Sequence, residues 1–365
     1  MTKKKKSATL KDVAKYANVS IKTVSNVVND WPYVSDATRE KVQRAIKEVG
    51  YRPNQMARGL ITGQTKMVGI IIEDISNPFF GLSMKGCEDV LYEHGYTLFL
   101  CSTSGDAKRE RYHLDSLIGR AVDGIILWGT RMPRDEVHGR IGDELPVLTV
   151  EFHEPPFGEN HAIINVDNAG GAEAATTHLI RQGRQHIAHI EGPAGLITAE
   201  GRLKGYQHAF EKAGRAIDPN IILEAQPSIR GGYQAALSLL ERQRPDAIVC
   251  YNDLVAVGAI LAARHLGLAV PKDLAVVGFD DITMASMVEP PLTTVRIPQY
   301  ELGKLSGEVI LKRLEQKPAE VQSILYPLEL KIRGSCGGRR MTKKQRQHLV
   351  ENLISHLSVD LLLET

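Results

Sequence analysis

Two polar side chains near the amino terminus have types and spacing suited to contacting the base edges of DNA. Lys22 and Asn26 lie four residues apart, which places both on one face of a helix. Lysine can bond guanine O6 and N7, asparagine can bond adenine N6 and N7, and Ile21 can touch a thymine methyl group. Ser25 and Asn29 are expected on the same outward surface. The pattern predicts a helix that enters a DNA groove, although ordinary helical domains also carry exposed asparagines.

A second group of polar side chains follows the expected β-strands. Ligands of parallel α/β sheets bind at the carboxyl ends of strands, where carboxylates and amides can bond hydroxyl groups. The group comprises Asp74, Asn77, Glu151, Asn252, Asp253, Asp280 and Asp281. The four from Asn252 onward have an alternative role as caps of the helices that follow. The strand ends therefore predict a small-molecule site.

The same carboxylates would also suit a doubly wound enzyme. The sequence contains no GxGxxG, GxxxxGK[ST], GxSxG or HExxH motif, and no other feature favours catalysis. We therefore expect a protein that is not an enzyme. A cytoplasmic small-molecule-binding protein without a role on DNA is a further alternative, but it leaves the Lys22 and Asn26 pair unexplained.

Three short helices are expected to position the DNA-contacting side chains. Thr9, with an acidic residue three positions later, begins the first helix, and Asn18 ends it in a left-handed turn. Ser20 caps the second helix, and a third runs over residues 35–49 before Gly50. The inward faces are apolar: Leu10, Val13, Ala14, Ala17, Val24, Val27 and Val28. Two helices joined by a tight turn are typical of a helix-turn-helix unit.

The charge is distributed unevenly along the 365 residues. Residues 1–66 hold 14 Lys and Arg against 5 Asp and Glu, a balance of +9, whereas residues 67–365 hold 31 against 38, a balance of −7. A basic head on an acidic body is typical of a module that binds a polyanion joined to one that binds another partner. A solvated basic tail is the alternative for Lys3–Lys6 alone.

Cysteine usage and hydropathy indicate a reducing, aqueous compartment. The four cysteines show no CxxC spacing, and three lie in apolar runs: Cys87, Cys101, Cys250 and Cys336. Buried free thiols are expected, without a disulfide framework, metal site or cofactor. No apolar h-region follows the basic start, and no run approaches eighteen apolar residues. We expect a soluble, cytoplasmic protein without a membrane partner.

From Met67 onward, apolar runs rich in β-formers alternate with helical patterns. The expected strands lie at residues 67–74, 97–103, 124–129, 146–151, 162–167, 186–192, 221–226, 246–253 and 274–281. The expected helices lie near residues 79–94, 106–120, 169–183, 200–213, 231–242 and 254–266. This alternation predicts parallel sheets covered by helices on both faces.

Several motifs in order resemble the lactose-repressor (LacI) family of bacterial transcription regulators. The resemblance is carried by the run TLKDVAKYANVSIKTVSNVVND, then by VSDATREKVQRAIKEVGYRPNQMARGL, VGIIIEDISNPFF, VDGIIL, GRLKGY, YNDLVAVGAI, VVGFDD and LKIRGS. It covers roughly residues 8–335. It implies a small all-α helix-turn-helix head and an α/β body of two doubly wound parallel-sheet lobes of the periplasmic sugar-binding-protein type. The implied function is a repressor that binds a pseudo-palindromic operator as a homodimer under the control of a small molecule.

The resemblance also implies a domain organisation. Residues 1–52 would form the DNA-binding head, and residues 53–66 a hinge helix and linker. Residues 67–335 would form the effector-binding and dimerisation domain. Its first lobe would take residues 67–165 and 297–335, and its second lobe residues 166–296. Residues 336–365 would be a carboxyl-terminal extension.

Individual residue roles are implied by matching motifs. The implied DNA contacts are Thr9, Ser20, Ile21, Lys22, Thr23, Ser25, Asn26 and Asn29 in the head, and Asn54, Ala57, Arg58 and Leu60 in the hinge. Leu60 matches a leucine that wedges open the central base step in the minor groove. Gly59 departs from the family, because a better helix former commonly stands there. The implied effector contacts are Asp74, Asn77, Phe79, Phe80, Trp128, Glu151, Arg202, Asn252 and Asp280. Core packing is the alternative for the two phenylalanines.

Departures from the family pattern bear on which class of effector the protein would bind. Leu196 stands where a purine effector would want a basic residue, and Pro227 where many members place an aromatic lid. Glu151 replaces a commoner aspartate. A carbohydrate is the favoured effector.

Apolar residues of the segment 341–363 recur at four- and three-residue spacing, which indicates either a helix that joins dimers into a tetramer or one that docks on its own body.

Overall fold

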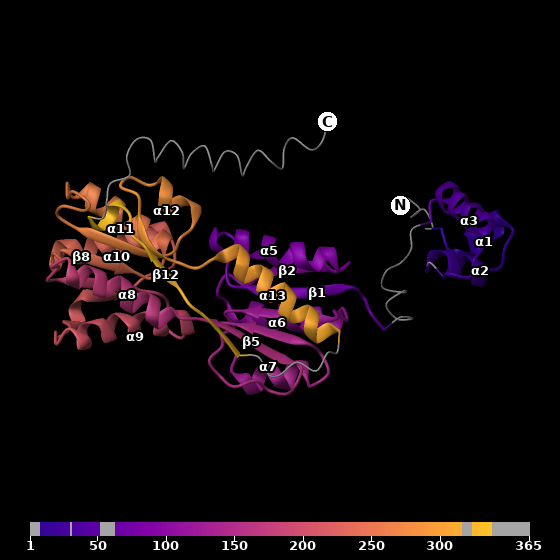
Figure 1. The fold of residues 1–365 in the computed structure, drawn as a ribbon, viewed down its shortest axis with the longest axis horizontal. Helices are drawn as coiled ribbons and strands as arrows, with labels where there is room; N and C mark the ends of the chain where they lie inside the picture. Colours follow the sequence, from indigo (N-terminus) through magenta and orange to yellow (C-terminus); the bar gives the residue numbers. More distant parts are fainter. Residues whose placement is uncertain (1–7, 30, 52–62, 316–322, 338–365) are drawn as a thin grey trace, which may run out of the picture. The chain divides into compact units, whose positions relative to one another are not determined.

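The protein divides into two compact units, residues 1–66 and residues 67–365 (Figure 1). The computed structural model describes residues 8–29, 31–51, 63–315 and 323–337. Each unit is described by itself. Within the described residues, no helix is long and apolar enough to cross a membrane.

The first unit is a bundle of three short helices, α1 (Leu10–Ala17), α2 (Ile21–Val28) and α3 (Asp36–Val49). The predicted ends are confirmed. The Asp12 carboxylate accepts bonds from the Thr9 backbone N–H at 2.8 Å and the Thr9 hydroxyl at 2.7 Å. Asn18 adopts a left-handed conformation with φ of 46°, and the Ser20 hydroxyl accepts a bond from the Thr23 N–H at 3.0 Å. The apolar faces meet in a core around Val13, where α1 packs on both other helices.

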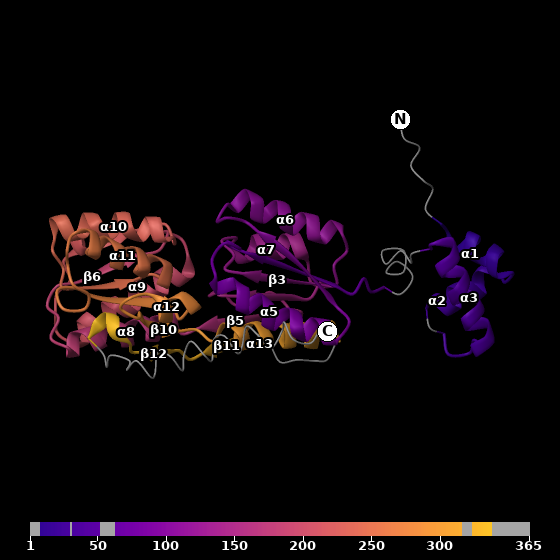
Figure 2. The ribbon, with the colours of Figure 1, turned by 90° about the horizontal axis from the view of Figure 1, so that it is seen from above.

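The first lobe of the second unit is built on a parallel sheet with the strand order β11-β5-β4-β3-β1-β2. The strands are β1 (Met67–Ile72), β2 (Thr97–Ser102), β3 (Gly124–Trp128), β4 (Val147–Val150), β5 (His161–Val166) and β11 (Ser323–Tyr326). The helices are α5 (Phe79–Glu93), α6 (Ala107–Gly119), α7 (Arg134–Ile141) and α13 (Gln299–Leu314). α5 and α13 cover one face of the sheet, and α6 and α7 cover the other (Figure 2).

The second lobe repeats the design with the strand order β12-β10-β9-β8-β6-β7. The strands are β6 (Ile187–Glu191), β7 (Ile222–Glu224), β8 (Ala247–Cys250), β9 (Ala275–Asp280), β10 (Thr293–Arg296) and the antiparallel β12 (Glu329–Lys331). The helices are α8 (Asn168–Arg181), α9 (Ile197–Lys212), α10 (Ile229–Arg242), α11 (Asp253–His265), α12 (Thr283–Met287) and the 3₁₀ turns η1 (Pro219–Ile221) and η2 (Gly334–Cys336). α8 and α9 pack on one face, and α10 and α11 on the other. Two doubly wound lobes were predicted, and this is confirmed.

One part of the predicted division between the lobes is wrong. Residues 297–335 were assigned together to the first lobe, but only α13 and β11 belong to its sheet and layers. β12 pairs with β10, so the chain returns to the second lobe after Tyr326. The strand is three residues long, too short for a period of two to mark it in the sequence. The short elements β10, β11, α7 and α12 were missed, and so was the long helix α13.

Candidate functional site

The predicted DNA-contacting residues of the head gather around α2. Ile21 and Lys22 are exposed, and Asn26 is half-buried on the same helix. The Asn29 amide donates to the Ser25 hydroxyl at 3.3 Å. The hydroxyl oxygens of Thr23 and of the cap residue Ser20 lie 2.8 Å apart at the start of α2. Thr9 lies at the start of α1. The surface therefore offers a cation, amides, hydroxyls and one apolar side chain, the groups that bind phosphates and base edges. The hinge residues Asn54, Ala57, Arg58 and Leu60 lie outside the described residues, as does the segment 341–363.

A cavity in the second unit collects side chains from both lobes. Its empty volume is about 630 Å³, including the solvent space at its open mouth. The lining consists of Glu73, Asn77, Phe79, Phe80, Trp128, Gly129, Glu151, Val166, Leu196, Thr198, Arg202, Pro227, Tyr251, Asn252, Asp280, Ile297 and Leu302. Eight of the nine predicted effector residues lie on this wall. No group of three metal-ligating side chains that could hold an ion occurs among the described residues.

Asp74 is the predicted residue that does not line the cavity. Its carboxylate accepts bonds from the Ser76 backbone N–H at 2.9 Å and the Ser76 hydroxyl at 2.8 Å, so it closes the turn after β1. Glu73 lines the cavity instead. Neighbouring residues at the end of an extended strand point to opposite sides, so an offset of one residue changes which carboxylate faces the cavity.

Three aromatic rings form one corner of the cavity. The centroids of Phe79 and Phe80 lie 5.2 Å apart, and each lies 6.2 Å from the centroid of Trp128. All three pairs are edge-to-face, the favoured arrangement for aromatic side chains. The rings are more than nine-tenths buried and belong to the largest apolar core while also lining the cavity. Core packing of the two phenylalanines is therefore confirmed, and their contact with an effector stays a prediction.

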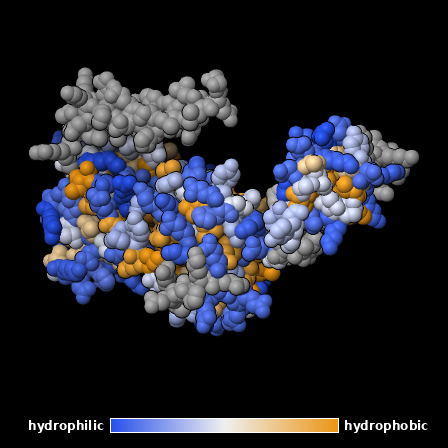
Figure 3. All heavy atoms as spheres, turned by 45° about the vertical axis from the view of Figure 1, so that its right-hand side comes forward, coloured by the Kyte–Doolittle hydropathy of each residue, from blue (hydrophilic) through white to orange (hydrophobic). Residues whose placement is uncertain are grey.

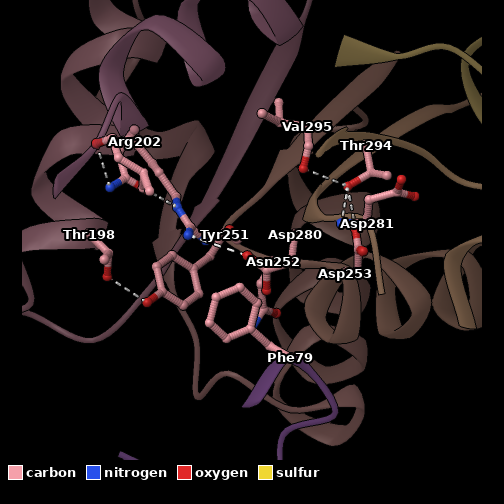
Figure 4. Close-up of polar contacts among 12 residues, drawn as sticks. Phe79, Thr198, Arg202, Tyr251, Asn252, Asp253, Asp280, Asp281, Thr294 and Val295 are labelled. Atoms are coloured by element: carbon pink, nitrogen blue, oxygen red, sulfur yellow. Dashed lines mark hydrogen bonds and ion pairs between the residues drawn. The ribbon is translucent and has the colours of Figure 1, made fainter. Parts of the chain in front are cut away.

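Arg202 is held on every side in the second lobe (Figure 4). Its Nε donates to Asn168 Oδ1 at 2.9 Å, Nη1 to the Tyr251 carbonyl at 2.5 Å and Nη2 to Asp280 Oδ1 at 3.3 Å. The guanidinium carbon also lies 3.8 Å from the centroid of the Phe279 ring. A planar cation with several fixed donors can keep such contacts where lysine cannot. Arg202 is therefore a fixed part of the cavity wall.

The two aspartates at the end of β9 occupy strained backbone. Asp280 has φ of 112° and Asp281 has φ of 57°, and both values lie in the region that favours glycine. The strain lets the two side chains diverge: Asp280 faces Arg202, and Asp281 pairs with Arg333 at 2.6 Å. Neither carboxylate caps α12, whose N-cap is Ile282 without a side-chain bond. The capping alternative is therefore wrong for this pair.

Asn252 caps a helix as predicted, and its contact with an effector stays a prediction. Its side-chain oxygen accepts a bond from the Val255 N–H at 3.0 Å and caps α11, and the residue also lines the cavity. Asp253 is fully buried and accepts bonds from the Thr294 hydroxyl at 2.5 Å and the Ile282 N–H at 2.8 Å. Burial raises the Asp253 pKa well above its ordinary value, and the Asp280 charge raises it further. Asp253 therefore stabilises the strand ends from behind the wall.

Glu151 joins the two lobes beside the cavity. Its carboxylate accepts bonds from the Val166 N–H at 3.2 Å in the first lobe and from the Asn168 amide at 2.9 Å at the start of α8. Asn168 in turn accepts from Arg202, so hydrogen bonds connect Glu151 to the arginine across the lobe junction. Burial raises the pKa of Glu151 to about 7, because the Arg202 charge and the two hydrogen bonds offset only part of the desolvation.

Replacing Glu151 with glutamine is expected to change how stability depends on pH. The carboxyl pKa rises from 4.5 to about 7 on folding, so its contribution is fully present below pH 4.5 and is lost as pH rises through 7. Relative to Glu151→Gln, the unfolding free energy of the parent protein should fall by about 3 kcal/mol over that window. Urea unfolding at pH 5, 6, 7 and 8 measures this difference.

The quantity to compare is the difference in unfolding free energy between the parent protein and Glu151→Gln at each pH. His161 and His189 have pKa values lowered by burial to about 4, so they stabilise the fold as pH rises from 4 to 6.5 and oppose the glutamate. Both histidines are present in the variant and cancel in the comparison. Parallel pH profiles for the two proteins would mean that Glu151 is not desolvated in solution.

Sequence reasoning missed several members of the cavity wall. Glu73 was passed over for its neighbour, and Thr198, Tyr251 and Ile297 received no role. The hydroxyls of Thr198 and Tyr251 lie 2.8 Å apart, and burial raises the Tyr251 pKa to about 12. Tyr251 ends the run DAIVCY immediately before Asn252, so its position after a buried strand was the available signal.

Both units of the chain are similar to parts of known bacterial regulatory proteins. Residues 9–54 match the bacterial regulatory proteins of the lacI family, and residues 176–336 match the periplasmic binding protein-like domain. The ribose operon repressor of Halalkalibacterium halodurans is 38% identical over 90% of this chain and 97% of its own. The transcriptional repressor PurR of Aliivibrio fischeri is 36% identical over 91% of this chain and 99% of its own. A lac repressor dimer bound to operator and the anti-inducer ONPF is 29% identical, with a TM-score of 0.81 over 91% of this chain and 99% of that one.

Proposed function

The chain belongs to the LacI family of bacterial regulatory proteins, and on that premise we propose how its own residues bind operator and effector. It is a DNA-binding transcriptional repressor controlled by a sugar or another small effector, and it is not an enzyme. We propose that the surface of α2 around Lys22 and Asn26 contacts the operator and that the cavity of the second unit binds the effector. The observation that carries the second assignment is the convergence of both lobes on one cavity around Arg202.

The favoured effector is a carbohydrate. Carboxylates on the cavity wall can accept bonds from hydroxyl groups, and the corner formed by Phe79, Phe80 and Trp128 can pack on the apolar face of a sugar ring. A ribose operon repressor is among the similar proteins. A purine is the second candidate, because PurR is also similar. Two residues of the cavity wall argue against a purine. Leu196 stands where a purine effector would want a basic residue, and Pro227 stands where many family members have an aromatic lid.

A mobility-shift experiment tests the proposed function. Full-length protein is mixed with palindromic DNA from the region upstream of its own gene, with and without candidate sugars and purines. Specific retardation that a sugar changes supports both assignments. No specific binding to any such fragment would contradict the operator-binding role, and a response to purines alone would replace the carbohydrate. The operator lies on the chromosome, so we place the protein in the cytoplasm.

We also propose that the chain acts as a homodimer. Among the described residues, the edge strand β2 pairs only with β1, and all six of its residues are exposed or half-buried despite its apolar sequence. Phe99 is 42% exposed and Leu100 is 37% exposed. Apolar side chains also reach the surface of the body elsewhere (Figure 3). An exposed apolar edge strand is a liability unless another chain covers it, and a lac repressor dimer is among the similar structures. A tetramer formed through residues 341–363 remains a further prediction.

Replacing Leu100 with lysine is expected to separate the dimer. A buried, unpaired ammonium at an apolar interface is strongly unfavourable, so the dissociation constant of the dimer should rise by at least about 100-fold. Sedimentation velocity at micromolar concentration should find monomer, and operator affinity should fall with it. Leu325→Lys is the matched control, because this 65% exposed leucine lies on β11 at the opposite edge of the same sheet. A dimer that survives Leu100→Lys would move the interface away from β2.

A further inference from the structure

The charged groups of the cavity wall are strongly unbalanced. Three carboxylates line it, those of Glu73, Glu151 and Asp280, against the single cation Arg202. Glu73 has a partner outside the lining, because Arg131 Nη2 lies 3.2 Å from its Oε1. Asp280 pairs with Arg202 at 3.3 Å. These two pairs leave Glu151 as the lining carboxylate that no cation contacts.

Glu151 has only uncharged hydrogen-bond partners, and it is almost fully buried. They are the Val166 N–H and the Asn168 amide, each of which donates to one carboxylate oxygen. The residue is 4% exposed. An ionised carboxylate in such surroundings repels any further anion at short range, and water that could screen the repulsion is largely excluded.

Arg202 is already paired with a carboxylate of the protein. Each of its three nitrogens already donates to a protein oxygen, and Phe279 and Tyr251 cover its faces at 3.8 and 4.7 Å. One N–H remains on each terminal nitrogen and can donate to a ligand oxygen. The positive charge, however, is already paired with Asp280, so Arg202 offers an incoming phosphate no unpaired counter-charge.

We propose that the cavity binds an uncharged sugar and rejects the phosphorylated form of the same sugar. The inference rests on the effector role proposed above and narrows the class of ligand. Hydroxyl groups donate to the three carboxylates and accept from Arg202, while the aromatic corner packs on the C–H face of the ring. A phosphate would face Glu151 and Asp280 without a counter-charge of its own.

Matched pairs of ligands test the proposal on the full-length protein. Isothermal titration at pH 8 compares D-ribose with D-ribose 5-phosphate, D-glucose with D-glucose 6-phosphate and D-fructose with D-fructose 6-phosphate. At least one free sugar should bind, and its phosphorylated counterpart should bind at least about 100-fold more weakly. Tighter binding by any phosphorylated member, or no binding by every free sugar, would overturn the proposal.

The variant Glu151→Gln tests whether Glu151 causes the preference for free over phosphorylated sugar. Glu151→Gln keeps the size of the side chain and removes its charge, so the gap between free and phosphorylated sugar should narrow by about 10-fold or more at pH 8. Glu144→Gln is the matched control, because this exposed carboxylate contributes the same net charge but does not line the cavity. An unchanged gap in Glu151→Gln would overturn the role of Glu151. Operator binding without ligand, measured on the same samples, separates a failure of the proposed function from a failure of this selectivity.

Discussion

Replacing Arg202 with leucine is expected to lower the free energy of unfolding by about 3–5 kcal/mol and to abolish the response to effector. The guanidinium is about 95% buried and bonds Asn168, the Tyr251 carbonyl and Asp280. Its loss leaves a buried carboxylate without a counter-charge and two buried acceptors without donors. Urea unfolding followed by circular dichroism measures the stability, and mobility shift with the sugar identified by titration measures the response.

Two further variants separate the ion pair from general damage. In the double variant Arg202→Leu with Asp280→Asn, the uncompensated charge is gone, so part of the lost stability should return. Arg181→Leu removes an exposed arginine at the end of α8 and should change stability by less than about 0.5 kcal/mol. If Arg202→Leu unfolded at the same urea concentration as the parent, the Arg202 contacts would contribute no net stability. If Arg202→Leu kept its stability but lost the response to effector, the role of Arg202 would be limited to ligand binding.

The head was predictable from the sequence because its determinants are local. Thr9, Asn18, Ser20 and Gly50 act on the backbone within a few residues of themselves, so the helix ends follow from residue type alone. The inward faces follow from helical spacing in the same way. No contact distant in the sequence was needed to place Lys22 and Asn26 on one helix.

The strands that complete each sheet were less predictable. β10, β11 and β12 are three or four residues long. β11 pairs with β5, about half the chain earlier, and β12 pairs with β10 across an intervening helix and strand. Such pairing is set by tertiary contacts, which override weak local preferences. The resemblance to a family gave the correct two-lobed architecture, but only the strand pairing reveals that the chain returns to the second lobe at β12.

The cavity was predicted at the level of strand ends but not at the level of single contacts. The rule that ligands bind at the carboxyl ends of strands located Glu151, Asn252 and Asp280. It could not separate Glu73 from Asp74, because that choice depends on where β1 ends. Nor could it foresee that Arg202 would have its donors occupied, since its partners come from three separate segments of the chain.

Replacing Asn26 with alanine is expected to remove operator recognition while leaving non-specific DNA binding intact. The half-buried Asn26 on α2 has a side-chain amide that can bond an adenine edge, and one such pair contributes about 1–3 kcal/mol of discrimination. A dimer carries the change in both heads, so specific binding should weaken by about 2–6 kcal/mol. Phosphate contacts are untouched, so affinity for unrelated DNA and its salt dependence should remain.

The fold of the head gives this experiment a clean control. The Asn26 backbone carbonyl, which accepts the Trp31 N–H at 2.9 Å, is unchanged by the substitution, so the melting curve of the head should stay close to that of the parent. Gln43→Ala removes an exposed amide from α3 and should leave operator affinity unaltered. Lys22→Ala tests the neighbouring cation: a flatter dependence of affinity on salt would identify a phosphate contact, because each neutralised phosphate contributes roughly −0.9 to the slope. If Asn26→Ala weakened binding to operator and to unrelated DNA equally, α2 would contact the backbone rather than the bases, and sequence recognition would have to come from another part of the chain.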